Sequence, residues 1–255
     1  MDKNTLDIEY CNPFNEDLHE FWMKIEHFGR YLYASDIAVR NDVEVALDIA
    51  CANGYGCREL AKVAKKVIGI DKNDEILSQT EQSFLQNGVA NIELLACDIE
   101  KACISDLISQ KVDLITSFET LEHINTPKQV IMEYFKLLKE DGILLISIPN
   151  LKYETLDDVG SPRNPYHKKV FKLQEFVTML EEIGFSIIKV LSQPYTNIFL
   201  NREIDLLERG CYEKEFISSL YNHSEEAIRY FSLLMAYPKE NDIDDSYSII
   251  IEAKK

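Results

Sequence analysis

The segment from Val45 to Asp71 constrains the fold more than any other part of the chain. Two short apolar runs, 43–49 and 66–70, predict buried strands, and the amphipathic stretch 58–65 between them predicts a connecting helix. The intervening turn places alanine and glycine at alternate positions, so its backbone can approach a ligand closely. Asp71 follows the turn by about 20 residues, at a strand end where a carboxylate can accept both hydroxyls of a ribose. The segment therefore predicts a nucleoside-binding strand–helix–strand unit.

The spacing of the turn argues against a dinucleotide. A dinucleotide-binding turn carries three glycines as G-x-G-x-x-G and receives a pyrophosphate at its helix N-terminus. Here the pattern is Asp48-x-Ala50-x-Ala52-x-Gly54-x-Gly56, and a carboxylate at position 48 repels a pyrophosphate but suits an ammonium group. The expected ligand is a nucleoside joined to an amino acid: S-adenosylmethionine, with S-adenosylhomocysteine as its product. An ordinary turn in another α/β protein, such as a nicotinamide-dependent oxidoreductase, is the alternative.

Strands and helices alternate along the rest of the chain. Helical spacing covers 16–40, 75–86, 127–139 and 173–183, and further strands are expected at 92–97, 112–118, 143–148, 185–192 and 247–253. The alternation predicts an α/β fold with a doubly wound, mostly parallel sheet of seven strands. We expect a single domain over 1–255, composed of an N-terminal helical cap (1–42), a cofactor-binding core (43–150) and a substrate-side half (151–255) with a helical insertion at 195–240.

The composition limits the partners. The 255 residues carry a formal charge of −17, which repels phosphate backbones and makes nucleic acid an unlikely substrate. No apolar run is long enough to span a membrane, no signal peptide is evident, and the six cysteines form no C-x-x-C pair, so we expect a cytoplasmic protein. A local basic patch runs against the acidic trend and suits an anionic small molecule; it contains Arg163, Lys168, Lys169 and Lys172.

Five strand-end motifs together resemble those of class I S-adenosylmethionine-dependent methyltransferases. They are the turn 47–56, the second strand end 68–71, Ala96-Cys97-Asp98-Ile99, the fourth-strand run 118–124 and the fifth-strand run 142–150. Two shorter runs, 27–34 and 164–167, are similar to methyltransferases encoded among bacterial surface-polysaccharide genes. The resemblance implies a Rossmann-like sheet with an antiparallel last strand. It also implies an acceptor among the sugar-linked or phosphorylated precursors of capsule or O-antigen.

The resemblance also implies which residues hold the cofactor. Asp98 would accept from the adenine amine and Ile99 would pack on the ring, while Asp48 would act on the amino group of the methionine moiety. The turn departs from the common motif at 52 and 53, where Ala52 and Asn53 replace a glycine and an acid, and Asn53 can still hydrogen-bond the methionine moiety. The full set of expected cofactor residues is Asp48, Ala50, Asn53, Gly54, Asp71, Lys72, Asp98, Ile99 and Phe118.

Two histidines are candidates for the chemistry. Methyl transfer from a sulfonium is an in-line displacement that depends largely on positioning, but an alcohol acceptor must also lose its proton. His123 follows the fourth strand and His167 lies in the loop after the fifth, and imidazole is a natural base near neutral pH. Structural roles for either histidine, such as capping a helix, are the alternative. Glu119 is the third catalytic candidate, and the expected acceptor contacts are Arg30, Tyr31, Arg163, Tyr166, His167 and Lys168.

Several functional alternatives stay open on sequence alone. No zinc-like ligand spacing exists, and the paired acids Asp157 and Asp158 are more typical of a solvated loop, so no metal is expected. The acceptor atom can be oxygen or nitrogen, with O-methylation favoured, and a cofactor-binding module without catalysis is a further possibility. The segment 195–240 is aromatic-rich and could form a lid over the acceptor or the surface of a homodimer.

Overall fold

One mixed sheet of seven strands forms the centre of the protein, in the order β3-β2-β1-β4-β5-β7-β6. The computed structural model describes residues 11–14, 21–154, 156–157, 160–211, 224–240 and 242–255. The strands are β1 (Val45–Ile49), β2 (Lys66–Asp71), β3 (Ile92–Ala96), β4 (Val112–Ser117), β5 (Leu138–Pro149), β6 (Ser186–Ser192) and β7 (Ser248–Lys254). β7 runs antiparallel to both of its neighbours, β5 and β6. The doubly wound sheet with an antiparallel last strand is therefore confirmed.

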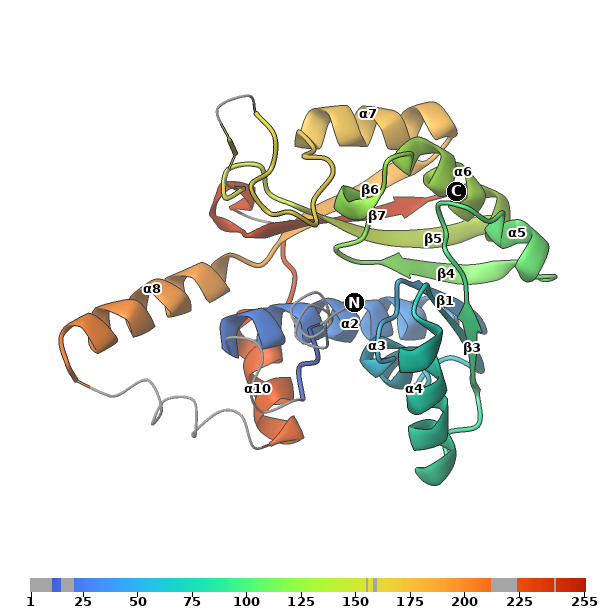
Figure 1. Cartoon of the computed structure of the whole chain (residues 1–255), viewed down its shortest axis with the longest axis horizontal. Coiled ribbons are helices and arrows are strands. Elements are labelled where there is room, and N and C mark those ends of the chain that lie inside the picture. The colour runs from blue at the N-terminus through green and yellow to red at the C-terminus, as the bar shows by residue number, and fades with distance from the viewer. Residues whose placement is uncertain (1–10, 15–20, 155, 158–159, 212–223, 241) are drawn as a thin grey trace.

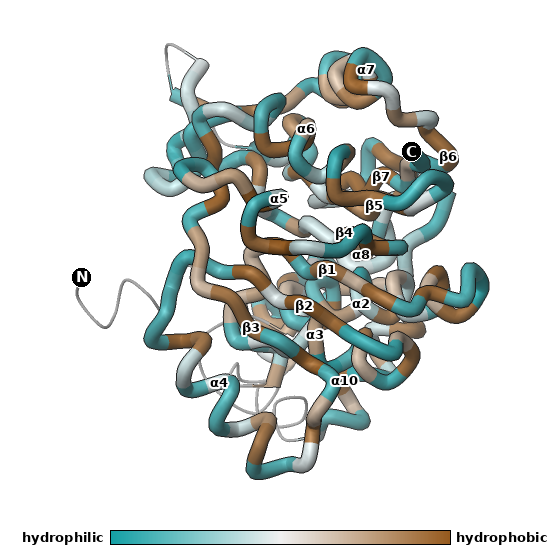
Figure 2. Tube along the Cα trace, turned by 90° about the vertical axis from the view of Figure 1, so that its right-hand side faces the viewer, coloured by the Kyte–Doolittle hydropathy of each residue, from teal (hydrophilic) through white to brown (hydrophobic). Residues whose placement is uncertain are grey.

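Helices cover both faces of this sheet (Figure 1). The described helices are α2 (Phe21–Arg40), α3 (Tyr55–Leu60), α4 (Asp74–Gln86), α5 (Ile104–Leu107), α6 (Pro127–Leu137), α7 (Leu173–Ile183), α8 (Pro194–Glu208) and α10 (Glu225–Met235). A short 3-10 helix, Leu121–His123, lies between β4 and α6, and another, Ile243–Asp245, lies between α10 and β7. The brown segments in the interior of Figure 2 follow the strands, as expected for a sheet that is buried on both sides.

The alternation of side chains along β1 separates two cores. Leu47 and Ile49 pack with residues of α6 and α7 on one face of the sheet. Ala46 packs with α2 and α3 on the other face. Successive side chains of a strand point to opposite faces, so one short apolar strand supplies both cores. This double burial explains why the sequence of β1 is almost continuously apolar.

Local signals set most helix boundaries where the sequence places them. Asn73 caps α4 by accepting a hydrogen bond from the amide of Ile76 at 3.1 Å. Pro127 begins α6, and Gly184, with φ of 120°, ends α7. Several boundaries differ from expectation. β5 begins five positions early, at Leu138 rather than 143, and α3 covers Tyr55–Leu60 rather than 58–65, while α6 ends at Leu137 rather than 139. In β5 the expected turn at 141–142 is absorbed into the strand, where Asp141 adopts a positive φ of 66°.

The described part of the insertion packs on the N-terminal helix. Ile228 and Ala236, from α10 and its C-terminal end, join Phe21, Ile25 and Phe28 of α2 in a third apolar cluster. Gly29 allows the close approach, because a Cβ there would overlap the carbonyl of Ala236. Residues 212–223 of the predicted insertion lie outside the described residues. No helix within the described ranges has the length and apolar character needed to cross a membrane.

Candidate active site

A cavity of about 790 Å³ lies at the carboxyl ends of the parallel strands. Its wall is built by the segments that follow β1, β2, β3 and β4, by the loop 164–168, by the first half of α2, and by Tyr247 and Ser248. In α/β sheets this edge is where ligands bind, beside the point at which the strand order reverses. The reversal here lies between β1 and β4, and the volume suits a ligand of nucleotide size.

Asp71 holds the turn after β1 in place. Its Oδ2 accepts the backbone N–H of Ala52 at 3.0 Å, and its Oδ1 accepts the N–H of Asn73 at 2.9 Å. Ala50 and Ala52 adopt φ values of 56° and 50°, a left-handed conformation that costs an L-residue about 1–2 kcal/mol. The Asp71 bond therefore helps to hold a strained loop against the cavity. Asp71, Lys72, Ala50 and Ala52 all line the cavity, and the first three of them belong to the predicted cofactor residues.

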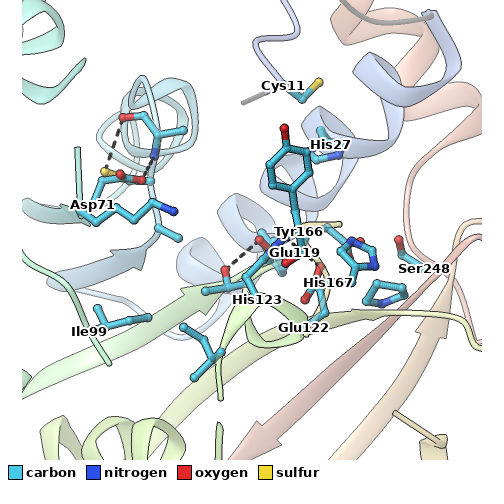
Figure 3. A pocket seen from close by; sticks show the side chains of 18 of the residues that line it. Cys11, His27, Asp71, Ile99, Glu119, Glu122, His123, Tyr166, His167 and Ser248 are labelled. Carbon is cyan, nitrogen blue, oxygen red and sulfur yellow. Dashed lines mark hydrogen bonds and ion pairs between the residues drawn. The ribbon is translucent and has the colours of Figure 1, made fainter. Parts of the chain in front are cut away.

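Asp98 and Ile99 form the next part of the wall. The Oδ2 atom of Asp98 lies 2.6 Å from Nζ of Lys101, and its Oδ1 accepts the backbone N–H of Glu100. The hydrogen bond from the Lys101 ammonium lowers the pKa of the Asp98 carboxyl. Ile99 is 9% exposed and faces the cavity beside it. Figure 3 shows Ile99 and Asp71 on the same side of the cavity. A carboxylate acceptor beside an apolar side chain is what an adenine amine and ring require.

Asp48 is fully buried behind the turn and does not line the cavity. Its carboxylate accepts hydrogen bonds from Thr116 Oγ1 at 2.7 Å, Tyr31 Oη at 2.9 Å and Cys57 Sγ at 3.3 Å. Burial raises its pKa to about 6, and the hydrogen bonds from Thr116 and Tyr31 oppose that rise. Asp48 therefore supports the turn and the ring of Tyr31 from beneath. Its predicted action on the cofactor's amino group would have to pass through these neighbours.

Tyr31 connects this buried network to the cavity. Its ring lies edge-on to Phe118 and to Tyr55, with centroids 5.1 Å apart in each pair. Gly56 makes room for it, because a Cβ at that position would overlap the Tyr31 ring. Phe118 and Tyr31 both line the cavity, as predicted, but the Tyr31 hydroxyl is occupied by Asp48.

Arg30 and two glutamates form a buried ionic group on the α2 side. The guanidinium of Arg30 lies 3.7 Å from Glu26 and 3.6 Å from Glu119, and it donates to Gln193 and Ser248 at 3.0 and 2.9 Å. Burial raises the pKa of Glu26 to about 7, although the charge of Arg30 opposes this. The Nη1 atom of Arg30 has no hydrogen-bond partner within the described residues.

Glu119 is held in a strained conformation at the end of β4. Its φ is 46°, and Ser147 fixes it twice: Ser147 Oγ accepts the Glu119 N–H at 2.9 Å and donates to its carboxylate at 2.6 Å. A glutamate with positive φ persists only where surrounding contacts determine it. The strain turns the chain so that Glu119, Glu122 and His123 all face the cavity.

His123 and His167 meet across two loops. Their ring centroids are 5.1 Å apart, and both rings line the cavity (Figure 3). The backbone N–H groups of Lys168 and Lys169 donate to the carbonyl of Glu122 at 2.7 and 3.1 Å, which ties the loop after β5 to the turn after β4. Glu122 is buried, and the loss of water together with the charge of Glu119 raises the pKa of its carboxyl well above its usual range.

The structure brings together most of the residues predicted from sequence. Four predicted residues do not line the cavity: Asp48, Asn53, Gly54 and Arg163. Of the basic patch, only Lys168 lines it. Their predicted roles stay predictions. Five further lining residues were not predicted from the sequence: Trp22, Glu26, His27, Glu122 and Tyr247. The first three lie on α2, whose mixture of aromatic and polar side chains was a signal for them.

The insertion does not form the wall of the cavity in the described ranges. None of the residues described within 195–240 lines it, because α8 and α10 pack on the far side of α2. The acceptor side is instead covered by α2 itself and by the loop 164–168. A dimer surface on the insertion stays a prediction.

A sheet of this order with such a site defines the class of S-adenosylmethionine-dependent methyltransferases. A solved structure of an S-adenosylmethionine-dependent methyltransferase from Clostridium acetobutylicum superposes with a TM-score of 0.59 at 16% identity, covering 89% of this chain and 91% of that one. At that identity the likeness shows the fold. Residues 41–200 match the methyltransferase domain family, which is more than half of the chain. The protein belongs to this family, which sets aside the nicotinamide-dependent oxidoreductase.

Proteins with similar sequences are also named as methyltransferases. A probable S-adenosylmethionine-dependent methyltransferase of Mycolicibacterium smegmatis is 27% identical over 141 residues, 55% of this chain and 51% of that protein. A ubiquinone biosynthesis O-methyltransferase of Glaesserella parasuis is 35% identical over 176 residues, 62% of this chain and 74% of that protein. The match spans about half the length of the mycobacterial relatives.

Proposed function

We propose that this protein transfers the methyl group of S-adenosylmethionine to a hydroxyl of a small, sugar-linked acceptor. One observation carries the proposal: a single cavity joins a nucleoside end, with Asp71 and Ile99, to an end where His123 and His167 meet. A methyl donor held at the first end would present its sulfonium toward the second. The family and the O-methyltransferase relative support this reading.

The reaction would be an in-line displacement. The acceptor oxygen forms a bond to the methyl carbon as the carbon–sulfur bond breaks, and its electron pair stays on sulfur to give neutral S-adenosylhomocysteine. The hydroxyl proton must leave, and the histidine end is where it can go. His123 Nδ1 lies 2.9 Å from the carbonyl of Tyr166, which only accepts, so Nδ1 carries the hydrogen and the neutral ring keeps its basic nitrogen at Nε2. A positioned base contributes about 10²–10⁴-fold to such a step.

The charge of the wall favours a neutral acceptor over an anionic one. Among the described residues that line the cavity, Glu26, Glu119 and Glu122 lie with Arg30, and those of the three carboxyls that are ionised suit a sulfonium but repel a carboxylate or phosphate. The lysines lie at the other end, where Lys101 and Lys168 pair with Asp98 and Glu100. This refines the predicted anionic acceptor and remains compatible with a precursor of surface polysaccharide.

Aromatic side chains near the acceptor end fit a sugar. Trp22 and Tyr247 both line the cavity, with ring centroids 5.3 Å apart. Tyr153 stacks on Tyr247 with ring centroids 5.9 Å apart, and this stack supports the tyrosine ring. Such rings offer flat apolar faces to the C–H groups of a pyranose while leaving its hydroxyls available to polar neighbours.

Turnover with labelled donor tests the proposal. The full chain would be incubated with methyl-labelled S-adenosylmethionine and a panel of nucleotide-sugars, free sugars, catechols and amines, and the methylated atom identified by NMR. O-methylation of a sugar supports the proposal, whereas labelling of an amine alone, or binding of donor without any turnover, refutes it. His123→Ala should lower kcat by about 10²-fold or more with unchanged affinity for S-adenosylhomocysteine. The surface variant Lys172→Ala should match the wild type.

A further inference from the structure

Glu122 has a buried carboxyl group to which the proposed reaction gives no role. Its side chain is 1% exposed, and neither carboxylate oxygen has a hydrogen-bond partner within the described residues. A buried carboxylate without partners is costly, and buried charges in proteins are paired or coordinate metals. The nearest polar atom in an ion-pair geometry is Nε2 of His123, 3.7 Å from Glu122 Oε1.

Both neighbouring histidines are oriented through Nδ1. His123 Nδ1 donates to the carbonyl of Tyr166 at 2.9 Å, and His167 Nδ1 lies 3.1 Å from the carboxylate of Glu154. A histidine that binds a metal characteristically donates its other ring N–H to a backbone carbonyl or to a carboxylate. One histidine here has the first arrangement and the other has the second. Nε2 of each neutral ring then carries the lone pair that can bind a metal ion.

The three side chains converge on one point of the cavity wall. A carboxylate oxygen of Glu122 and one ring nitrogen from each of His123 and His167 all lie within 4.8 Å of one another. Bonds of about 2.1 Å would bring ligands to about 3.3 Å apart around a tetrahedral ion, a contraction that small side-chain rotations can supply. Figure 3 shows the three side chains gathered in the same part of the cavity.

We propose that Glu122, His123 and His167 bind a divalent transition-metal ion that receives the acceptor's hydroxyl oxygen. Two imidazoles and one carboxylate favour Zn²⁺, Mn²⁺, Fe²⁺ or Co²⁺ over Mg²⁺ and Ca²⁺, which prefer oxygen ligands alone. Three protein ligands leave further positions for substrate, as in catalytic rather than structural sites. The sequence-based expectation of no metal rested on the loop acids 157–158, of which Asp158 lies outside the described residues, and on the absence of local ligand spacing.

The role in the reaction rests on the proposed O-methylation, whereas the binding of the ion does not. With its Nε2 bound to the ion, His123 would be a ligand and would no longer act as the base of the proposed reaction. An acceptor hydroxyl bound to the ion would instead have a lowered pKa and release its proton to a solvent water. The oxygen would then form the bond to the methyl carbon, and the carbon–sulfur electron pair would stay with sulfur. No oxidant or reductant is needed. The ion would also fix the acceptor oxygen near the strained turn at Glu119.

Cobalt absorption tests the site without any need for turnover. The full chain, expressed without a histidine tag and stripped with EDTA, would be titrated with Co²⁺, and the visible d–d bands would report nitrogen ligation. We expect the bands in the wild type, their displacement by Zn²⁺, and affinities at least about 10-fold weaker in Glu122→Gln and His167→Ala. Glu154→Gln, which alters only the support of His167, should weaken binding by about 10- to 100-fold. His27→Gln, which alters another histidine of the cavity, should bind as the wild type does.

Failures of the two proposals are distinguishable. Absence of d–d bands in the wild type, or bands unchanged in Glu122→Gln and His167→Ala, overturns the metal site whatever the turnover assay shows. Methylation that persists in EDTA overturns the ion's role in the reaction and leaves O-methylation standing. Binding of Co²⁺ with no methylated sugar supports the site and counts against the acceptor class alone. Thermal unfolding controls for folding: Glu122→Gln should be about as stable as the wild type, because burial already raises the pKa of the Glu122 carboxyl and glutamine is a neutral side chain of the same shape.

Discussion

Replacing Asp48 by asparagine should change how the stability of the protein depends on pH. Burial holds the pKa of Asp48 at about 6, against 3.8 for a free carboxyl. The native state therefore binds this proton more tightly than the unfolded chain, and the free energy of unfolding falls as pH rises between those two values. A shift of this size corresponds to about 3 kcal/mol in total, of which roughly 1.4 kcal/mol is lost between pH 5 and pH 8.

Asparagine keeps the shape and one carbonyl oxygen for Tyr31 and Thr116 but carries no charge to bury. Urea unfolding at pH 5, 6, 7 and 8 gives the difference in free energy between Asp48→Asn and wild type at each pH. That difference should shift in favour of the variant by about 1.4 kcal/mol across the range, with most of the change between pH 5 and pH 6. Taking the difference between the two proteins cancels the titration of their other groups, Glu26 among them.

Asp113 provides a control of opposite sign. Its carboxylate accepts the amide of Val45 and pairs with Lys139 at 2.6 Å, and these contacts lower its pKa. It therefore stabilises the protein above the pKa of the unfolded chain, and this contribution is lost as pH falls through the lower native value. Asp113→Asn should be destabilised throughout pH 5–8 with little change across it. If the difference in unfolding free energy between Asp48→Asn and the wild type is also independent of pH, Asp48 is not held at a raised pKa.

Three further substitutions test the cofactor end of the cavity. Gly56→Ala should destabilise the protein by more than about 2 kcal/mol in thermal or urea unfolding, because the added methyl overlaps the buried ring of Tyr31; a wild-type midpoint would contradict the packing described. Asp71→Asn should weaken the binding of S-adenosylhomocysteine by about 10- to 100-fold in calorimetry, because it removes a charge-assisted hydrogen bond. Unchanged affinity would show that Asp71 does not bind the ribose. Ala52→Gly should stabilise the chain by up to about 1 kcal/mol, since φ there is 50°, and a loss of stability would argue against the left-handed turn.

The sequence predicts those parts of the fold and site that depend on near neighbours. Strand β1 is recognisable because it is buried on both faces, and α4 because Asn73 caps it. Asp71 and Asp98 were predicted at the cavity because each lies at or just beyond the end of a parallel strand, and parallel strands end at one edge. The beginning of β5 was missed because Asp141 adopts a positive φ within a strand, which favours a turn in any local reading.

Asp48 shows where strand-end reasoning stops. It lies within β1, where consecutive side chains point to opposite faces, and its direction depends on what packs beneath the turn. Thr116 from β4 and Tyr31 from α2 take up one of its carboxylate oxygens, and neither contact is encoded near position 48. Its position near the end of a strand therefore did not show that Asp48 points away from the cavity.

The histidine end depends on a contact between loops that are more than 40 residues apart in sequence. Lys168 and Lys169 donate their amides to the carbonyl of Glu122, and the His123 ring donates to the carbonyl of Tyr166, so two backbone contacts and one histidine side chain bring the two loops together. None of these three contacts uses the side chain at 167, so that residue can change without loss of the contacts. A relative with the same backbone but another residue at 167 would keep the cavity and lose one of the three converging ligands. Acceptor chemistry can therefore differ between members of this family while the cofactor end stays the same, and for this reason the donor is easier to predict from sequence than the acceptor.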